Sequence, residues 1–336
     1  MLLKLGEVPT LVVSSPEAAA EIMKTQDVSF ASRPMISSVR IIAYGDKSPA
    51  FASYGSYWRE IRKMSILELL SIKRVLSFRS IREEEVLNFV RSMDLSSNSG
   101  CTVNLSGKFA LMTNYITATL TARAIIGRKF KYQKQFLQVL NRGLEASGGF
   151  SLADLFPSSS LVSLLSGMSL KLPRLHREMD AILSSIIREH RERNSTEQVE
   201  EDLVDVLLKV QREGSLPFAF TDVAVKAIIL DLFGAGGETT ATTLEWIISE
   251  LMRNPGAMKR VQQEVRVTVG GKGRVREEDI NEMNYLRMII KETLRLHPPL
   301  PLLLPRECQD QSAVAGEGTR HNGFLLDRVL GRRDPS

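Results

Sequence analysis

A long apolar run, from Thr221 to Arg253, constrains the fold of this chain more than any other stretch of its sequence. Its apolar residues recur at the spacing of one helix face: Val225, Ile228, Ile229, Leu232, Leu244, Ile247, Ile248 and Leu251. Thr221 suits the N-cap position, and Asn254-Pro255 supplies a stop signal. A continuous helix of this length is about 50 Å long. The run therefore predicts a mainly helical protein in which one helix crosses a whole domain.

The centre of this run, Ala235-Gly-Gly-Glu-Thr-Thr240, is poorly suited to a helix, because each glycine costs roughly 1 kcal/mol relative to alanine. A phosphate loop is excluded because no lysine follows the glycines, and a threonine stands where a dinucleotide fingerprint needs its third glycine. Two interpretations remain. Either a second helix packs closely on the glycines, or the glycines let a flat ligand approach the backbone. In the second case the Thr239 hydroxyl bonds the Ala235 carbonyl and opens the helix, and Glu238 beside it passes protons.

Composition is that of an ordinary globular protein, with 43% apolar and 25% charged residues in a chain of 336. The net charge of +5 comes without basic tracts interleaved with aromatic residues, so nucleic acid is not an expected partner. An acidic protein or an anionic membrane surface suits this charge equally well. Cys101 and Cys308 lack the spacing of a disulfide framework or a zinc site, and no metal site is expected from them.

The rest of the sequence predicts a small sheet and a series of helices. Residues 2–13 indicate two short strands around a Gly6-Glu7 turn, and residues 26–53 and 146–170 indicate long loops of the kind that grip or admit ligands. Helical patterns cover 16–25, 57–63, 80–93, 110–126, 135–144, 173–193, 256–269 and 277–296.

Two pairs of side chains share a helix face. Trp58 and Arg62 are four residues apart, and they fit either a surface helix with a half-buried tryptophan or a clamp for a carboxylate or phosphate. Glu292 and Arg295 are three apart, a spacing that Glu250 and Arg253 repeat, and exposed pairs of this kind are usually weak. If buried, Glu292 and Arg295 anchor the proline-rich segment that follows them.

Several short motifs occur in a characteristic order: Ser14-Ser-Pro-Glu-Ala, Trp58-x-x-x-Arg62, Ala235-Gly-Gly-Glu-Thr-Thr, Asn284-Tyr-Leu, Lys291-Glu-Thr-Leu-Arg, Leu296-His-Pro-Pro and Pro305-Arg-Glu. Together they resemble those of the plant cytochrome P-450 haem-thiolate monooxygenases, in the large clan that oxidises specialised metabolites. The resemblance covers residues 1–308. It implies a mainly α fold with a small β-sheet, and hydroxylation of a small apolar, terpenoid-like metabolite with dioxygen and NADPH-derived electrons.

The resemblance also assigns roles to individual residues. Trp58, Arg62 and Arg306 correspond to propionate contacts of haem b, and Ala235 and Gly236 to the helix surface against the porphyrin. Thr239 and Glu238 correspond to the hydroxyl and the acid of proton delivery, and Glu292 with Arg295 to a buried ion pair of the haem-binding core. The implied substrate pocket includes Asp231, Phe233 and Leu302. The implied partners are NADPH-cytochrome reductase and, in the family, the cytoplasmic face of the endoplasmic reticulum membrane.

The sequence departs from the family pattern at both ends. The membrane-spanning helix and proline-rich hinge that begin the family are absent from it, so we expect these 336 residues in the cytoplasm. The loop of Phe, Gly, Arg, Cys and Gly that holds the axial thiolate is absent too, and Cys308 lacks the glycine-rich bulge of such a ligand. We therefore expect a partial domain at 1–308, incomplete at the C-terminus, a disordered, aberrant tail at 309–336, and an inactive chain. The alternative is a non-catalytic truncated helical protein or a small-molecule binding module.

Overall fold

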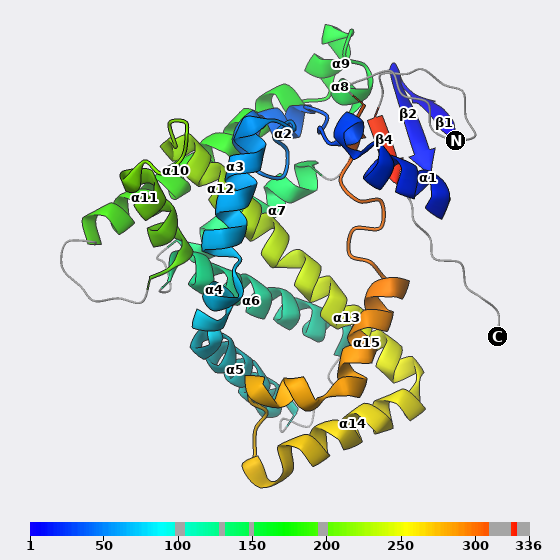
Figure 1. The fold of residues 1–336 in the computed structure, drawn as a ribbon, viewed down its shortest axis with the longest axis vertical. Coiled ribbons are helices and arrows are strands. Elements are labelled where there is room, and N and C mark those ends of the chain that lie inside the picture. Colours follow the sequence, from blue (N-terminus) through cyan, green and yellow to red (C-terminus); the bar gives the residue numbers. More distant parts are fainter. Residues whose placement is uncertain (98–104, 128–131, 148–150, 194–200, 309–323, 328–336) are drawn as a thin grey trace. The chain divides into compact units, whose positions relative to one another are not determined.

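The computed structural model describes residues 1–97, 105–127, 132–147, 151–193, 201–308 and 324–327, which form two compact units. The first unit comprises Met1–Ser71, Ile125–Gly234 and the described residues after position 300, and the second comprises Ile72–Ala124 and Ala235–Leu300, in each case the described residues of these ranges. Most of the described residues are helical, as the sequence predicted (Figure 1).

The first unit contains a four-stranded sheet with the order β1-β2-β4-β3. Its strands are β1 Leu2–Leu5, β2 Val8–Val13, β3 Arg306–Glu307 and β4 Phe324–Asp327, and Figure 1 draws the red β4 beside the blue β2. β2 pairs antiparallel with β1 and parallel with β4, and β3 pairs antiparallel with β4. The predicted hairpin at 2–13 is confirmed. The expectation of a disordered tail is wrong for 324–327, which form β4; residues 309–323 and 328–336 lie outside the described part.

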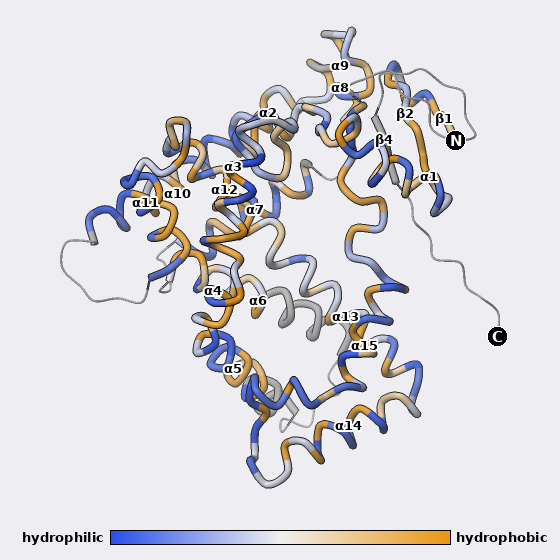
Figure 2. Tube along the Cα trace, viewed as in Figure 1, coloured by the Kyte–Doolittle hydropathy of each residue, from blue (hydrophilic) through white to orange (hydrophobic). Residues whose placement is uncertain are grey.

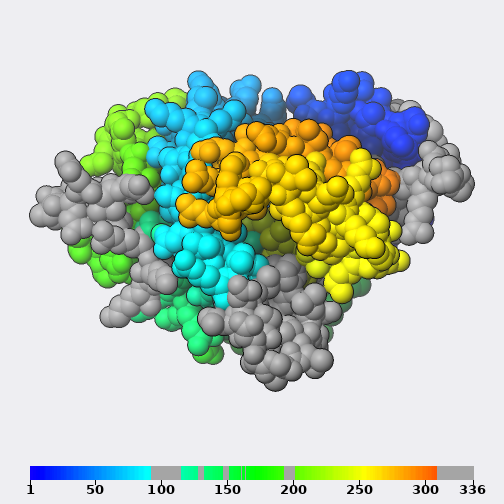
Figure 3. Space-filling view, turned by 90° about the horizontal axis from the view of Figure 1, so that it is seen from below, coloured from blue at the N-terminus to red at the C-terminus, as the bar shows by residue number. Residues whose placement is uncertain are grey.

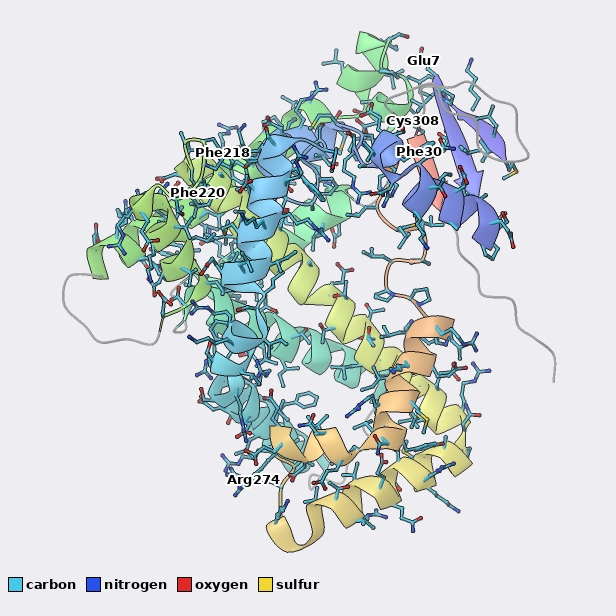
Figure 4. The ribbon with its side chains drawn as sticks, in the orientation of Figure 1. Glu7, Phe30, Phe218, Phe220, Arg274 and Cys308 are labelled. Carbon is cyan, nitrogen blue, oxygen red and sulfur yellow. The ribbon has the colours of Figure 1, made fainter. Side chains whose placement is uncertain are left out.

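A small apolar cluster packs beside this sheet and contains Val13, Ala19, Ile22, Phe30 and Cys308. Figure 4 shows Phe30 and Cys308 next to each other near the strands. Ser15 caps the helix that supplies part of the cluster, because its side chain accepts a hydrogen bond from the Ala18 N–H at 3.2 Å. Two short turns of other helix types continue this segment to Phe30.

The helices of the first unit contain many of its buried apolar side chains. They are α1 Pro16–Ala20, α2 Ser37–Ile41, α3 Ser56–Met64, α7 Gln133–Ser147, α8 Leu152–Leu155, α9 Ser160–Leu165, α10 Met168–Arg193, α11 Leu203–Glu213 and, up to Gly234, α12 Asp222–Gly236. α7 and α10 pack together, and Phe136, Met179 and Leu183 are almost completely buried there. Short helices thus occupy parts of both predicted loops.

The second unit consists of helices held by apolar contacts and ion pairs. They are α4 Ile72–Ser77, α5 Arg79–Ser97, α6 Leu105–Ile126 up to Ala124, α13 Glu238–Arg253, α14 Pro255–Val269 and α15 Asn284–Leu296. Hydrophilic and hydrophobic residues alternate along α14 (Figure 2), and its apolar side packs with α13 and α15. Figure 3 shows α14, in yellow, directly beside the orange residues of α15 and the turn that precedes it.

Two predicted helices differ from the structure in continuity. The run 221–253 is two helices, α12 and α13, separated at Gly237, and 277–296 is a 3-10 turn, Glu277–Glu282, followed by α15. Within the described ranges, no helix combines the length and apolar character needed to cross a lipid bilayer.

Candidate functional site

Threonine hydroxyls bond backbone carbonyls at the break between α12 and α13. The Thr239 Oγ1 donates to the Ala235 carbonyl oxygen at 2.7 Å, and the Thr240 Oγ1 donates to that of Gly236 at 3.1 Å. These carbonyls lie four residues back, where a regular helix receives a backbone N–H. The prediction that Thr239 bonds Ala235 where the helix opens is confirmed.

Gly236 is a point of close helix packing. A Cβ atom at this position would lie 3.2 Å from both the Oγ1 and the Cγ2 of Thr121 in α6. Packing of a second helix, one of the two interpretations open from sequence, therefore accounts for Gly236. Its contact with a flat ligand stays a prediction, as does that of the exposed Ala235.

Glu238 and Thr239 follow the break directly and differ in their surroundings. Glu238 begins α13, is exposed, and makes no hydrogen bond or ion pair with another described residue. Its negative charge suits the N-terminal end of that helix. Thr239 is half-buried, and its single hydroxyl proton is committed to Ala235. The pair thus offers an acid open to solvent next to an oxygen whose remaining lone pairs accept hydrogen bonds.

Trp58 and Arg62 do meet on α3, in an arrangement that differs from the predicted clamp. The guanidinium carbon of Arg62 lies 5.1 Å from the centroid of the Trp58 ring. The indole N–H donates to the Pro49 carbonyl at 3.1 Å, so it is occupied by backbone. Arg62 is exposed and has no carboxylate partner among the described residues. Binding of an anion at this place therefore depends on the Arg62 guanidinium, with Trp58 as its support.

Arg306 belongs to a second cationic group, and sequence reasoning missed the other arginine in it. Arg306 Nη1 donates to Asp27 Oδ1 at 2.9 Å, while Arg33 Nη1 donates to the carbonyls of Leu304 and Pro305 at 3.0 and 3.1 Å. Burial, and then the positive charge of Arg306, lower the pKa of Arg33 to about 10. Two guanidiniums sharing the single carboxylate of Asp27 leave positive charge for another anion to neutralise. A lone arginine in a loop gave no sequence signal for this role.

The three predicted pocket residues lie in different surroundings. The Asp231 carboxylate accepts hydrogen bonds from the Ser48 hydroxyl and the Ala50 N–H, and burial raises its pKa to about 6. Phe233 is 3% exposed and packs edge-on against Phe136 with ring centroids 4.6 Å apart. Leu302 is 43% exposed. Their contact with a substrate stays a prediction, and in this structure the side chains of Asp231 and Phe233 are engaged by protein.

Glu292 and Arg295 form the predicted ion pair but do not bury it. Arg295 donates to both carboxylate oxygens of Glu292, at 2.6 and 2.8 Å, yet the two side chains are 50% and 56% exposed. The prediction of a buried pair is wrong in this structure. α15 packs through Tyr285, Leu286, Ile289 and Ile290, and Glu292 and Arg295 lie outside that stripe.

The related Glu250 has a different partner. One of its carboxylate oxygens is 2.9 Å from the Nε2 of His297, whose ring stacks on Trp246 with centroids 3.7 Å apart. Arg253 lies at 3.7 Å from the same carboxylate. His297 thereby fixes the end of α15 to α13.

His190, Asp202 and Asp205 are a further cluster that sequence reasoning missed. Their ligand atoms lie within 4.8 Å of one another, the spacing of a metal site. His190 Nδ1 is 2.8 Å from the Ile186 carbonyl and its Nε2 is 3.0 Å from Asp202, which accepts the Asp205 N–H as the cap of α11. These contacts identify the cluster as a buried cap that joins α10 to α11. Cys308 likewise serves packing, since its thiol lies in the apolar cluster beside the sheet.

Comparisons with known proteins agree on one family. The cytochrome P-450 family model matches residues 1–319. A germacrene A hydroxylase of Barnadesia spinosa is 46% identical over 336 residues, which cover all of this chain and 66% of the relative. A melianol synthase of Azadirachta indica is 47% identical over 94% of this chain and 62% of its own length. An amorpha-4,11-diene 12-monooxygenase of Artemisia annua is 45% identical over all of this chain and 66% of its own length.

Solved structures agree on the fold. A zebrafish cytochrome P-450 solved with progesterone has a TM-score of 0.77, at 22% identity, over 98% of this chain and 75% of that one. The chain thus spans just under two thirds of the first curated relatives that it matches. The matches extend beyond residue 308, where the resemblance from sequence ended.

Proposed function

Because the chain belongs to the cytochrome P-450 family, we propose that it forms part of a haem-dependent monooxygenase that hydroxylates a small apolar metabolite of the terpenoid class. The observation that carries this proposal is Arg62, an exposed guanidinium held over an indole ring without a carboxylate partner in the described part of the chain. Such a group is ready to bind a carboxylate ligand.

The cationic groups of the first unit suit haem b, which carries two propionates. Arg62 would hold one carboxylate, and Arg306 with Arg33 would hold the other, where Asp27 neutralises only one of two positive charges. When bound, haem supplies the oxidation chemistry at its iron, with electrons from NADPH through a reductase partner. The protein supplies orientation and protons.

Protons would move through the pair at the start of α13. The Glu238 carboxylate is exposed and exchanges protons with water, and the Thr239 oxygen accepts a hydrogen bond because its own proton goes to Ala235. Both side chains directly follow Gly237, the residue that separates α12 from α13.

Terpenoid chemistry is supported by the names of the relatives, which act on germacrene A and amorpha-4,11-diene. Residues near 35–50, Asp231 to Ala235 and Leu300 to Leu304 are the proposed contacts with such a substrate. An endoplasmic reticulum membrane location and a reductase partner stay predictions of the same proposal.

A second candidate function is a small-molecule binding module without catalysis. This alternative stays a prediction, and Cys308 itself packs in an apolar cluster, a position that suits packing and not iron ligation. Inactivity of residues 1–336 on their own stays a prediction. Reduction with added haem and carbon monoxide tests it, because a red-shifted Soret band of a thiolate complex would contradict it.

Haem uptake tests the proposal directly. Titrating the purified chain with haemin, we expect Arg62→Ala and Arg306→Ala each to weaken binding by about tenfold, the usual size of a lost charge-assisted hydrogen bond. Arg59→Ala is the matched control, because Arg59 lies on the same helix over a different ring, that of Tyr54. Unchanged uptake in the two variants would remove their propionate roles, and absence of uptake by the wild type would favour a protein that does not use haem.

A further inference from the structure

One carboxylate on α12 fixes a loop that lies more than 180 residues earlier in the chain. The Ser48 hydroxyl lies 2.9 and 2.7 Å from the two oxygens of Asp231, and the Ala50 N–H donates to one of them at 3.0 Å. Ser48 is completely buried. Both oxygens of Asp231 are therefore used by the loop, and the backbone on either side of Pro49 is held.

The held segment orients the indole of Trp58. The Pro49 carbonyl, between the two anchored residues, accepts the Trp58 Nε1–H at 3.1 Å. The neighbouring Tyr57 hydroxyl donates to the Lys47 carbonyl at 3.0 Å. Two consecutive residues of α3 thus donate hydrogen bonds to backbone carbonyls of the same loop. The orientation of the Trp58 ring therefore depends on the position of Pro49.

The same ring supports Arg62, one helical turn further along α3. Because Arg62 is exposed and makes no ion pair with a described residue, the ring is the contact that limits the orientations of its guanidinium. A continuous set of contacts thus leads from Asp231 through Ser48 and Ala50 to Pro49, and through Trp58 to Arg62, all inside the first unit.

We propose that Asp231 is a positioning residue for the anion-binding guanidinium of Arg62, which it orients through the 48–50 loop and the Trp58 ring, and that it does not bind the substrate. The proposal deepens the proposed function and rests on it, since the anion is a haem propionate. It differs from the pocket role expected for Asp231, because a carboxylate that accepts from Ser48 and Ala50 is oriented toward protein donors. Its chemical role is to preorganise a cation.

Haemin and its dimethyl ester separate the carboxylate contribution from the rest of haem binding. The ratio of their dissociation constants measures preference for free propionates. We expect wild type to prefer haemin, Arg62→Ala to lose most of that preference, and Asp231→Ala to reduce it by about threefold to tenfold. Ser48→Ala, a milder change to the same contact, should reduce it less. Asp222→Ala is the control, because Asp222 is at the other end of α12 and pairs with Arg191.

Two further measurements distinguish a positioning role of Asp231 from a general loss of structure in the variant. Asp231→Ala should raise amide hydrogen exchange at Ala50, and in the double variant Asp231→Ala/Arg62→Ala the preference should equal that of Arg62→Ala alone. Full additivity of the two changes would overturn the proposal. So would an unchanged preference or an unchanged exchange rate at Ala50 in Asp231→Ala.

The proposed function can fail separately. A wild type that binds haemin and its diester equally would remove the propionate role of Arg62, whatever Asp231 does to the loop. If wild type prefers haemin and Arg62→Ala abolishes the preference, the propionate role holds. The preference for haemin measured in Asp231→Ala and Ser48→Ala then tests the positioning role of Asp231 separately from the propionate role of Arg62.

Discussion

Two carboxylates in this protein, Asp231 and Glu292, were both expected to matter, and the structure places them very differently. Asp231 joins residues more than 180 positions apart and holds a completely buried hydroxyl. Glu292 joins Arg295, three positions away, in a pair exposed to solvent. The number of short contacts that a carboxylate makes is therefore a poor guide to its contribution to stability. What counts is whether a contact links distant segments and whether water can replace it.

The largest expected effect is that of Asp231→Ala measured below pH 6, where the raised pKa keeps the Asp231 carboxyl protonated and its burial carries no cost of ionisation. The change leaves the buried Ser48 hydroxyl and the Ala50 N–H without their acceptor, and each such loss costs about 1–3 kcal/mol. We expect the free energy of unfolding to fall by about 3 kcal/mol in urea denaturation, on the same principle. Asp222→Ala, which removes an exposed partner of Arg191, should have a much smaller effect. Equal losses would mean that the loop contact is not special.

The second test uses pH. Burial raises the pKa of Asp231 to about 6 from 3.8, so between these values the folded protein binds a proton that the unfolded chain does not. Stability therefore falls as pH rises through this window, by up to about 3 kcal/mol from this one group. The Asp231→Asn variant has no titrating group at this position. The difference in unfolding free energy between Asn variant and wild type should shift in favour of the variant from pH 4 to pH 6. A constant difference would contradict the assignment.

The smallest expected effect is that of Glu292→Ala. Water replaces the carboxylate at this exposed site, so the urea midpoint should not change measurably, alone or together with Arg295→Ala. Far-UV circular dichroism of both variants should match that of wild type. A large loss of stability would show that the pair is buried in solution, as the family resemblance implies.

Local features of this fold were predictable from sequence. The hairpin at 2–13 follows from two apolar runs around a glycine turn, and the bond from Thr239 to the Ala235 carbonyl follows from a hydroxyl four residues downstream. The break in the long apolar run was harder to predict, because the single residue Gly237 separates α12 from α13.

Contacts between distant segments were not predictable. Arg33 meets the Pro305 carbonyl beside Arg306 across about 270 residues, and β4 pairs with β2 across more than 310, distances at which no spacing rule applies. The Asp231 contact with Ser48 is of the same kind. The exposure of Glu292 was not predictable either, because it depends on which face of α15 packs against α13 and α14.

The closeness of Gly236 to Thr121 limits which side chains these two positions can hold together. A side chain at 236 and the branched side chain at 121 compete for one volume, since their nearest atoms would be 3.2 Å apart. Alanine at 236 is therefore compatible with a small residue at 121, and a larger residue at either position restricts the other. The two sites are linked by size, so a substitution inherited at one limits which substitutions the other can accept.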